Sequence, residues 1–246
     1  MSEAGALLCG FWGENGVPTG LAWRLGDEEG AIAGRDLGSG EVTISVGGRL
    51  TEENDVVSIG FEQSDTPTEA TLSRGSGEVA LDRPSGGPAA GIPKAALCQA
   101  SVRTEGNGKP RRSRGFVVRW DDDPAAGAGI FRAVALPAPN DEVVLLTARR
   151  EPGAANHAEE TITAWLLRVD GTATAFDEAL LSTQYDGDGL QTRLGLELWP
   201  PEGTSPPLRG AGTTFGLSRA GGINAALMSS SVEGSEGVGA YLIRRA

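Results

Sequence analysis

The sequence is poor in lysine, histidine and cysteine, and each shortage narrows the range of possible functions. Lys94 and Lys109 are the only lysines, so arginine carries almost all of the positive charge. The formal net charge of -12 disfavours nucleic acid as a partner, because its phosphates are bound by basic side chains. The same charge disfavours an anionic membrane surface. We therefore expect no nucleic acid and no membrane among the partners.

Cys9 and Cys98 are the only cysteines, which are too few for a disulfide framework. The sequence begins without the basic region and apolar run of a secretory signal, so we expect a cytoplasmic protein with two reduced, buried thiols. Its single histidine and two distant cysteines are a poor supply of zinc ligands, and we predict no metal site. No apolar run approaches the roughly 20 residues that a membrane-spanning helix needs.

Two familiar enzyme signatures are also missing. No glycine fingerprint opens a helix within a βαβ unit, which argues against a nucleotide cofactor, and we predict that the protein works without cofactors. No nucleophile elbow lies in a strand–turn–helix context, which argues against an α/β-hydrolase.

The sequence is rich in glycine (37 residues) and in short alternating segments. Val57, Ile59 and Phe61 alternate with polar residues, and the same period-two pattern recurs along the chain. Residues 176–182 are expected to form one helical turn at most. The sequence therefore predicts an all-β chain of about 14 to 18 strands, with the spacing of a sandwich or barrel.

The stretch RPSGGPAAGIP at residues 83–93 is the richest in glycine and proline, and such a composition neither buries much surface nor pairs as a central strand. We predict a division of the chain there. The N-terminal half comprises residues 1–83, the linker 84–93, and the C-terminal half 94–246.

Two loops look superficially like metal sites. Asp121, Asp122 and Asp123 precede Pro124 between two predicted strands, where a turn is the better interpretation. The segment 185–189 resembles the start of a calcium loop, but Gln191 stands where that loop needs glycine. It therefore predicts a hairpin turn.

The stretch from Glu159 to Pro200 holds the strongest patterns. Leu194, Leu196 and Leu198 share one strand face, which places Glu197 and Trp199 together on the other. A carboxylate beside an indole can line a ligand cavity, or it can belong to a solvated edge. His157, the only histidine, lies in a polar loop, where it acts as a general acid or base or is simply part of the surface.

Four segments carry a family resemblance. They are CGFWGENGVPTGLAWRL near the start, CQASVRTEGNGKPRRSRGFVVRW, NHAEETITAWLLRVDG, and LSTQYDGDGLQTRLGLELW followed by Arg-Gly-Ala-Gly. In this order they resemble the double-lipocalin-like family of carotenoid (hydroxyneurosporene) hydratases and AttH-type proteins. The resemblance implies two lipocalin-like antiparallel β-barrels or half-barrels packed together. It also implies an apolar ligand in a barrel mouth or between the halves, and no nucleotide cofactor.

We therefore expect a cofactor-independent hydratase, cyclase or isomerase that acts on a small hydrophobic, isoprenoid-like or polyketide-like molecule. Burial beside Trp199 would raise the pKa of Glu197 and make it the acid, with His157 as a second candidate. The wall residues are expected to be Trp199, Trp165, Tyr185 and Trp120, beneath a loop at residues 151–160. The alternatives are a non-catalytic binding protein for such a ligand and a structural subunit without a pocket.

Overall fold

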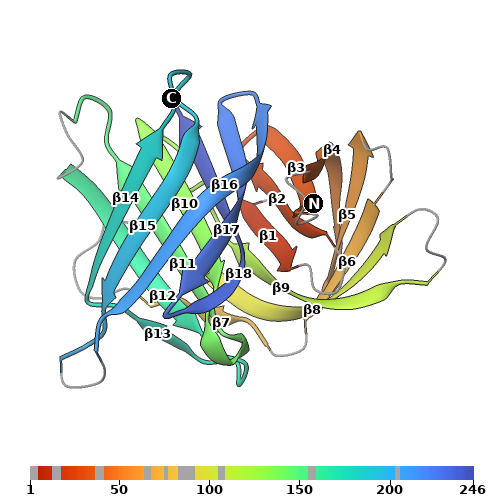
Figure 1. Ribbon diagram of the computed structural model, residues 1–246, viewed down its shortest axis with the longest axis horizontal. Helices are drawn as coiled ribbons and strands as arrows, with labels where there is room; N and C mark the ends of the chain where they lie inside the picture. The colour runs from red at the N-terminus through yellow and green to blue at the C-terminus, as the bar shows by residue number, and fades with distance from the viewer. Residues whose placement is uncertain are drawn as a thin grey trace.

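The computed structural model describes residues 5–12, 18–36, 42–63, 68–74, 77–82, 92–104, 109–154, 159–202 and 206–246. These residues form antiparallel strands and one short 3-10 helix, η1 (Pro139–Asp141) (Figure 1). The strands are β1 (Leu7–Trp12), β2 (Thr19–Leu25), β3 (Glu28–Asp36), β4 (Val42–Glu53), β5 (Val56–Gln63), β6 (Thr68–Arg74), β7 (Val79–Ala80), β8 (Lys94–Thr104), β9 (Arg111–Arg119), β10 (Ile130–Pro137), β11 (Val143–Arg150), β12 (Glu160–Leu167), β13 (Ala173–Ala175), β14 (Glu178–Tyr185), β15 (Gln191–Trp199), β16 (Leu208–Ala220), β17 (Ile223–Val232) and β18 (Ser235–Arg245).

The first sheet closes on itself as a barrel. Its order is β6-β5-β4-β3-β2-β1-β9-β8-β7, and β6 also pairs with β8, which completes a ring of eight strands with β7 as a short addition. Successive side chains of a strand point to opposite faces, so Leu7, Cys9 and Phe11 fill the interior together. Both predicted thiols are free and buried there, and burial raises the pKa of the Cys9 thiol.

The second sheet is a half-barrel with two edges. Its order is β13-β12-β11-β10-β18-β17-β16-β15-β14. Val134, Leu146, Leu196 and Met228 belong to the apolar cluster on its concave side. Together the two sheets confirm the predicted class: an all-β protein of two lipocalin-like antiparallel barrels or half-barrels packed together.

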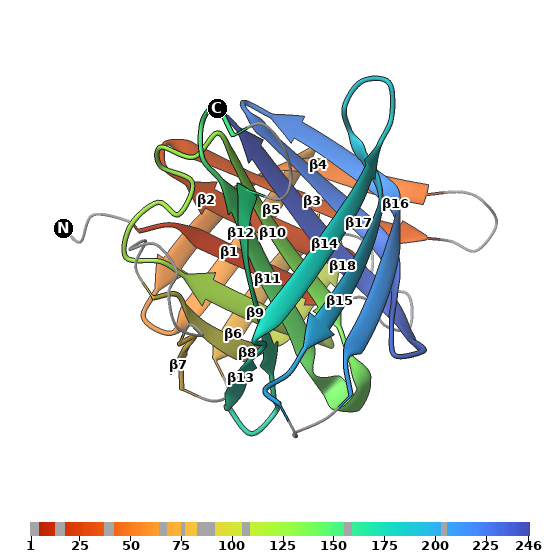
Figure 2. The same ribbon diagram turned by 90° about the vertical axis from the view of Figure 1, so that its left-hand side faces the viewer.

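The two sheets pack face to face, with the second sheet in front of the first in Figure 2, and a shared apolar layer joins them. On β1 the residue Leu8, which alternates with the barrel-filling Leu7 and Cys9, points to the other sheet, and Trp23 on β2 does the same. From the second sheet Ala133, Leu227 and Leu242 pack into the same layer. The central strands therefore bury both faces, which is why they are apolar almost throughout.

The chain passes from the first sheet to the second at residues 120–129. Arg149 holds this crossing by donating from Nη1 to the Pro124 carbonyl at 2.9 Å and from Nη2 to that of Ala126 at 2.9 Å. Asp123 accepts from the Ala125 amide at 2.9 Å and from Arg244 at 2.6 Å. The three consecutive aspartates thus belong to a turn, as predicted. The Asp123 side chain, however, forms hydrogen bonds within the protein and is not a freely solvated group.

The two sheets do not divide where the sequence analysis placed the linker. β8 follows the stretch 84–93 and pairs with β6 and β7, which precede it, so this stretch connects strands of one barrel. The predicted halves, 1–83 and 94–246, therefore do not coincide with the sheets.

Several local expectations can also be compared with the structure. Turns join β12 to β13 and β14 to β15, with positive φ at Gly171 and Gly189, as the hairpin signals predicted. Residues 178–182, given one helical turn at most, instead belong to β14, where partly buried and exposed residues alternate. The described residues contain no helix that is long and apolar enough to cross a membrane.

A buried polar cluster lies on the concave side of the second sheet. Arg132 on β10 is 1 % exposed and forms an ion pair with Glu160 on β12. Its Nη1 donates to Thr183 Oγ1 on β14 at 3.1 Å and to the Tyr241 hydroxyl on β18 at 3.3 Å. Thr183 and Tyr241 also share a hydrogen bond of 2.8 Å. One guanidinium thus links β12 to β14, which do not pair as strands.

Arg132→Met should strongly destabilise the fold, because it removes one partner of the buried ion pair with Glu160. Loss of one partner of a buried ion pair costs about 3–5 kcal/mol, measured as the free energy of unfolding in urea. Adding Glu160→Gln should recover a large part of this loss. Arg209→Gln, which changes an exposed arginine, serves as the control and should leave stability unchanged. An equal loss of stability in this control would contradict the role given to the buried ion pair.

Alkaline pH should destabilise the protein through Tyr241. Burial raises the pKa of Tyr241 from 10.0 to about 12, so the folded state holds a proton that the unfolded state releases. This contribution is present below pH 10 and is lost as the pH rises through about 12, a decrease of about 3 kcal/mol in the free energy of unfolding.

Tyr241→Phe should remove most of this decrease in urea unfolding curves measured at a series of pH values. Both proteins are also measured with Cys9→Ala added, because ionisation of that buried thiol also destabilises the fold at high pH. The effect of Tyr241 is then separated from that of Cys9. A pH dependence unchanged by Tyr241→Phe would refute the expectation.

Candidate ligand-binding site

A groove of about 550 Å3 opens where the two sheets separate at one margin of the shared layer. This volume lies within the range of small-molecule sites, roughly 300–1,000 Å3. In Figure 1 the green connection between β10 and β11 lies beside β8 at this margin. The groove, called the inter-sheet groove below, is lined by Trp12 and residues 97–99 and 114–115 of the first sheet, and by residues 137–138, 141–143, 169 and 235–236 of the second.

The first sheet supplies a wall that is apolar at its base. Trp12, the last residue of β1, is half-buried and packs against Phe116 with ring centroids 5.3 Å apart. The Ser113 hydroxyl donates to the Trp12 carbonyl and fixes the end of the strand. Leu97 pairs with Phe116 across β8 and β9, and its side chain packs at the edge of the shared layer.

The second sheet supplies a wall of carboxylates. Between β10 and β11 the chain turns through Asn140 (φ 60, ψ 27) and Asp141 (φ 65), two successive non-glycine residues in the left-handed region. Asparagine and aspartate tolerate this conformation better than other side chains. The turn brings Asp141 and Glu142 to the groove, where Asp141 forms an ion pair with Arg114 of the opposite wall.

Glu142 combines partial burial with spare hydrogen-bonding capacity. Its side chain is 18 % exposed, and Arg168 Nε lies 3.4 Å from Oε1. This separation is longer than the roughly 2.7–2.9 Å of a tight charge-assisted hydrogen bond. The carboxylate is therefore held near a positive charge while its oxygens retain room for a ligand or a water molecule.

A glycine allows the rim of the groove to form. A Cβ atom on Gly237 would lie 2.5 Å from Cγ of Pro137, so no other residue fits there without a shift of the backbone. The close approach of β18 to the end of β10 places Ser235 and the exposed Glu236 at the rim.

Glu197 and Trp199 do share a strand face, as predicted, but it is the outer face of β15. The three leucines that alternate with them fill the concave side instead. The Glu197 side chain is 30 % exposed, and its Oε1 accepts from Arg209 Nε at 2.9 Å and Nη2 at 2.6 Å. This hydrogen bonding raises the pKa of Arg209. Glu197 lies in a surface ion pair and does not line the inter-sheet groove.

The other predicted residues are dispersed. Trp120 and Trp165 are buried in the shared layer, where Trp165 Nε1 donates to the Asp82 carbonyl at 2.9 Å. The cavity between them measures about 10 Å3, which is too small for an organic ligand. Tyr185 is partly exposed at the end of β14, with the Arg245 guanidinium 5.5 Å from its ring. His157 and residues 155–158 of the predicted covering loop lie outside the described residues.

The groove residues Trp12, Asp141 and Glu142 were not singled out by sequence reasoning. The Pro-Asn-Asp-Glu run after a strand is a turn signal, which indicates where these carboxylates leave the sheet but not what they face. Their partners are brought together by strands far apart in the chain.

Comparison with known proteins gives matches among solved structures. No protein-family model matches the chain, and no curated protein matches it. Kievitone hydratase from Nectria haematococca has a TM-score of 0.65 at 11% identity, covering 100% of this chain and 90% of its own. A putative AttH from Nitrosomonas europaea has a TM-score of 0.59 at 12% identity, covering 97% and 91%. CghA has a TM-score of 0.55 at 13% identity, covering 98% and 88%.

These matches confirm the double-lipocalin-like fold that the sequence resemblance implied. At such low identity they establish the fold alone, so the chemistry of the groove has to be argued from its own residues.

Leu97→Trp should fill the groove and weaken the binding of an apolar ligand. The neutral dye Nile red, titrated by fluorescence, serves as the probe. Leu180→Trp adds the same bulk on the exposed outer face of β14 and should leave binding unchanged. Equal dye affinity in wild type and Leu97→Trp would place the apolar site elsewhere.

Proposed function

We propose that the protein is a cofactor-independent hydratase, cyclase or isomerase that acts on a small, mostly apolar, isoprenoid-like or polyketide-like molecule held in the inter-sheet groove. The observation that carries the proposal is the pairing of an apolar wall at Trp12 and Leu97 with a carboxylate wall at Asp141 and Glu142. The fold supports it as well, because kievitone hydratase has the same architecture and is a hydratase by name.

Glu142 is the residue best placed for proton transfer. It is the more buried of the two carboxylates at the turn, with 18 % of its side chain exposed against 53 % for Asp141. As an isomerase base it would take a proton from one carbon of the ligand and return the proton to another. As a hydratase base it would take a proton from a bound water while the water oxygen attacks an alkene carbon, and a second carboxyl would protonate the neighbouring carbon.

The remaining groove residues would position the ligand. Trp12 offers an aromatic face against which an unsaturated ligand can pack. The ion pair between Arg114 and Asp141 links the two walls across the groove. The Arg168 guanidinium lies 3.4 Å from Glu142 and would position its carboxylate.

Glu142→Gln should lower turnover by about 10²- to 10⁴-fold, the usual contribution of a general acid or base, while ligand affinity is retained. The variant is incubated with a panel of terpenoid and polyketide alkenes and enones in deuterated water. Mass spectrometry then detects added water or incorporated deuterium.

Glu197→Gln is the matched control, because it makes the same change on the outer face of β15, and it should keep full activity. Turnover that survives Glu142→Gln but is lost in Glu197→Gln would overturn the choice of residue. Binding of panel members to the wild type without any turnover would support the alternative, a non-catalytic lipocalin-like binding protein.

A further inference from the structure

A row of basic side chains continues from the groove along the outer face of the β8–β9 hairpin. Strand register pairs Leu97 with Phe116, Gln99 with Arg114, and Ser101 with Arg112. Phe116 faces the shared layer and Arg114 lines the groove, so alternation places Arg112 on that same face, one step farther out. Arg103 follows at the same parity on β8.

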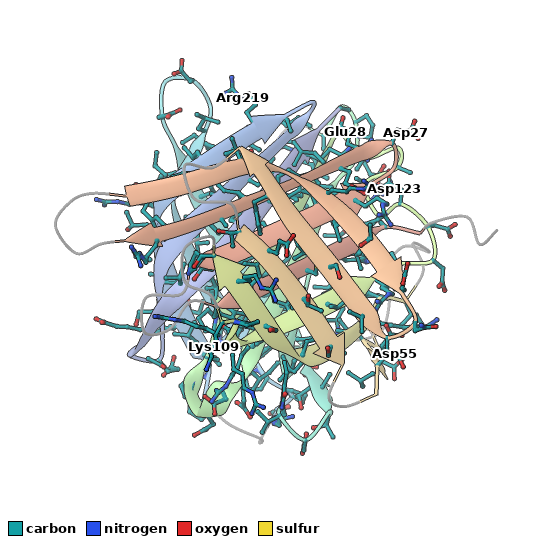
Figure 3. The ribbon with its side chains drawn as sticks, turned by 90° about the vertical axis from the view of Figure 1, so that its right-hand side faces the viewer. Asp27, Glu28, Asp55, Lys109, Asp123 and Arg219 are labelled. Carbon is teal, nitrogen blue, oxygen red and sulfur yellow. The ribbon has the colours of Figure 1, made fainter. Side chains whose placement is uncertain are left out.

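These side chains form a basic strip, defined as Arg103, Lys109, Arg112 and Arg114, on a protein whose net charge is -12. All four are exposed. Figure 3 shows Lys109 on the opposite side of the barrel from Asp27, Glu28 and Asp55. The strip is therefore a local reversal of the overall charge.

Part of this charge is not neutralised. Arg114 is paired with Asp141, and Arg103 lies opposite Glu69 in the register of β6 and β8. Arg112 and Lys109 form no ion pair with any residue that the structure describes. Arg112 and Lys109 thus add two exposed positive charges to the β8–β9 hairpin, which lines the groove at Arg114.

The opposite wall has the reverse sign. Asp141, Glu142 and Glu236 belong to the second sheet and face the same groove. An anionic group on a ligand is repelled by this wall and attracted by the strip, because unlike charges at short range are favoured even near a surface. The charges therefore orient a ligand that has an apolar body and an anionic end.

We propose that the ligand of the inter-sheet groove carries a phosphate-type anion, which lies over the basic strip at Arg112 while the apolar body lies against Trp12 and Leu97. This inference rests on the groove being the ligand site, as argued above. The same chemistry is found in a prenyl phosphate and in a phosphopantetheine thioester. Arg112 is the residue that recognises the anion, and a guanidinium suits a phosphate because its donors match the phosphate oxygens.

The test compares farnesol with farnesyl monophosphate, two ligands that share one apolar body. Binding is measured at low salt by calorimetry. The phosphate should bind about tenfold more tightly than the alcohol, which is the effect of one charge-assisted contact. Raising the salt concentration should reduce the difference, because exposed charges are screened.

Arg112→Gln should lower the affinity for the phosphate to that for the alcohol and leave the alcohol unchanged. Arg219→Gln removes one exposed arginine from the second sheet and should change neither ligand. To separate the two sources, S-farnesoyl phosphopantetheine, a thioester, is compared with farnesyl monophosphate in the same titration; tighter binding of one supports that source of the anion.

The failure of this inference differs from the failure of the groove itself. If farnesol binds in competition with Nile red and the phosphate binds no better, the groove stands and the anion site is refuted. An affinity for the phosphate that Arg112→Gln and Arg219→Gln change equally would also refute it, because general charge would then be responsible. If neither ligand binds, both the proposed ligand site in the groove and the proposed anion site at Arg112 are refuted.

Discussion

The shared apolar layer between the two sheets is the constraint on which the rest of the structure depends. Strands β1, β2, β9, β10, β17 and β18 contribute one face to the interior of their own sheet and the other to this layer. A one-residue slip would move every side chain of such a strand to the opposite face and lose the packing on both faces. The inter-sheet groove forms where this layer ends, so the packing of the layer positions its walls.

Much of the fold follows from the period-two pattern of the sequence. Alternation identified the strands, and the Asp-Gly pairs at Asp170 and Asp188 marked two hairpin turns. The division of the chain was harder to find. Residues 83–93 and 121–129 are both rich in small residues and both contain proline, and composition does not show which of the two leaves a sheet. The pairing of β6 with β8 shows that the chain stays in the first sheet after residues 83–93. A local sequence pattern does not predict a pairing between strands that are far apart in the chain.

The candidate site shows the same limit. Alternation states correctly that Glu197 and Trp199 share a face, but it does not state which face of β15 is inside. The three leucines take the concave side, and the carboxylate is left outside with Arg209. The groove instead joins Trp12 with Glu142 and Glu236, residues from distant parts of the chain. A single sequence gives the chemical types of such residues, whereas their proximity depends on how two curved sheets meet.

In each sheet the first strand in the chain pairs with the last, β1 with β9 and β10 with β18. Contacts that span a whole sheet form late and slow the folding of a domain. During synthesis the strands of the first sheet are all made before those of the second, so the barrel can close while its partner is unfinished. Its side that carries Leu8 and Trp23 then faces water until the second sheet packs against it. The topology thus creates an aggregation-prone interval in the life of every nascent chain, and the rate of translation relative to folding sets how long it lasts.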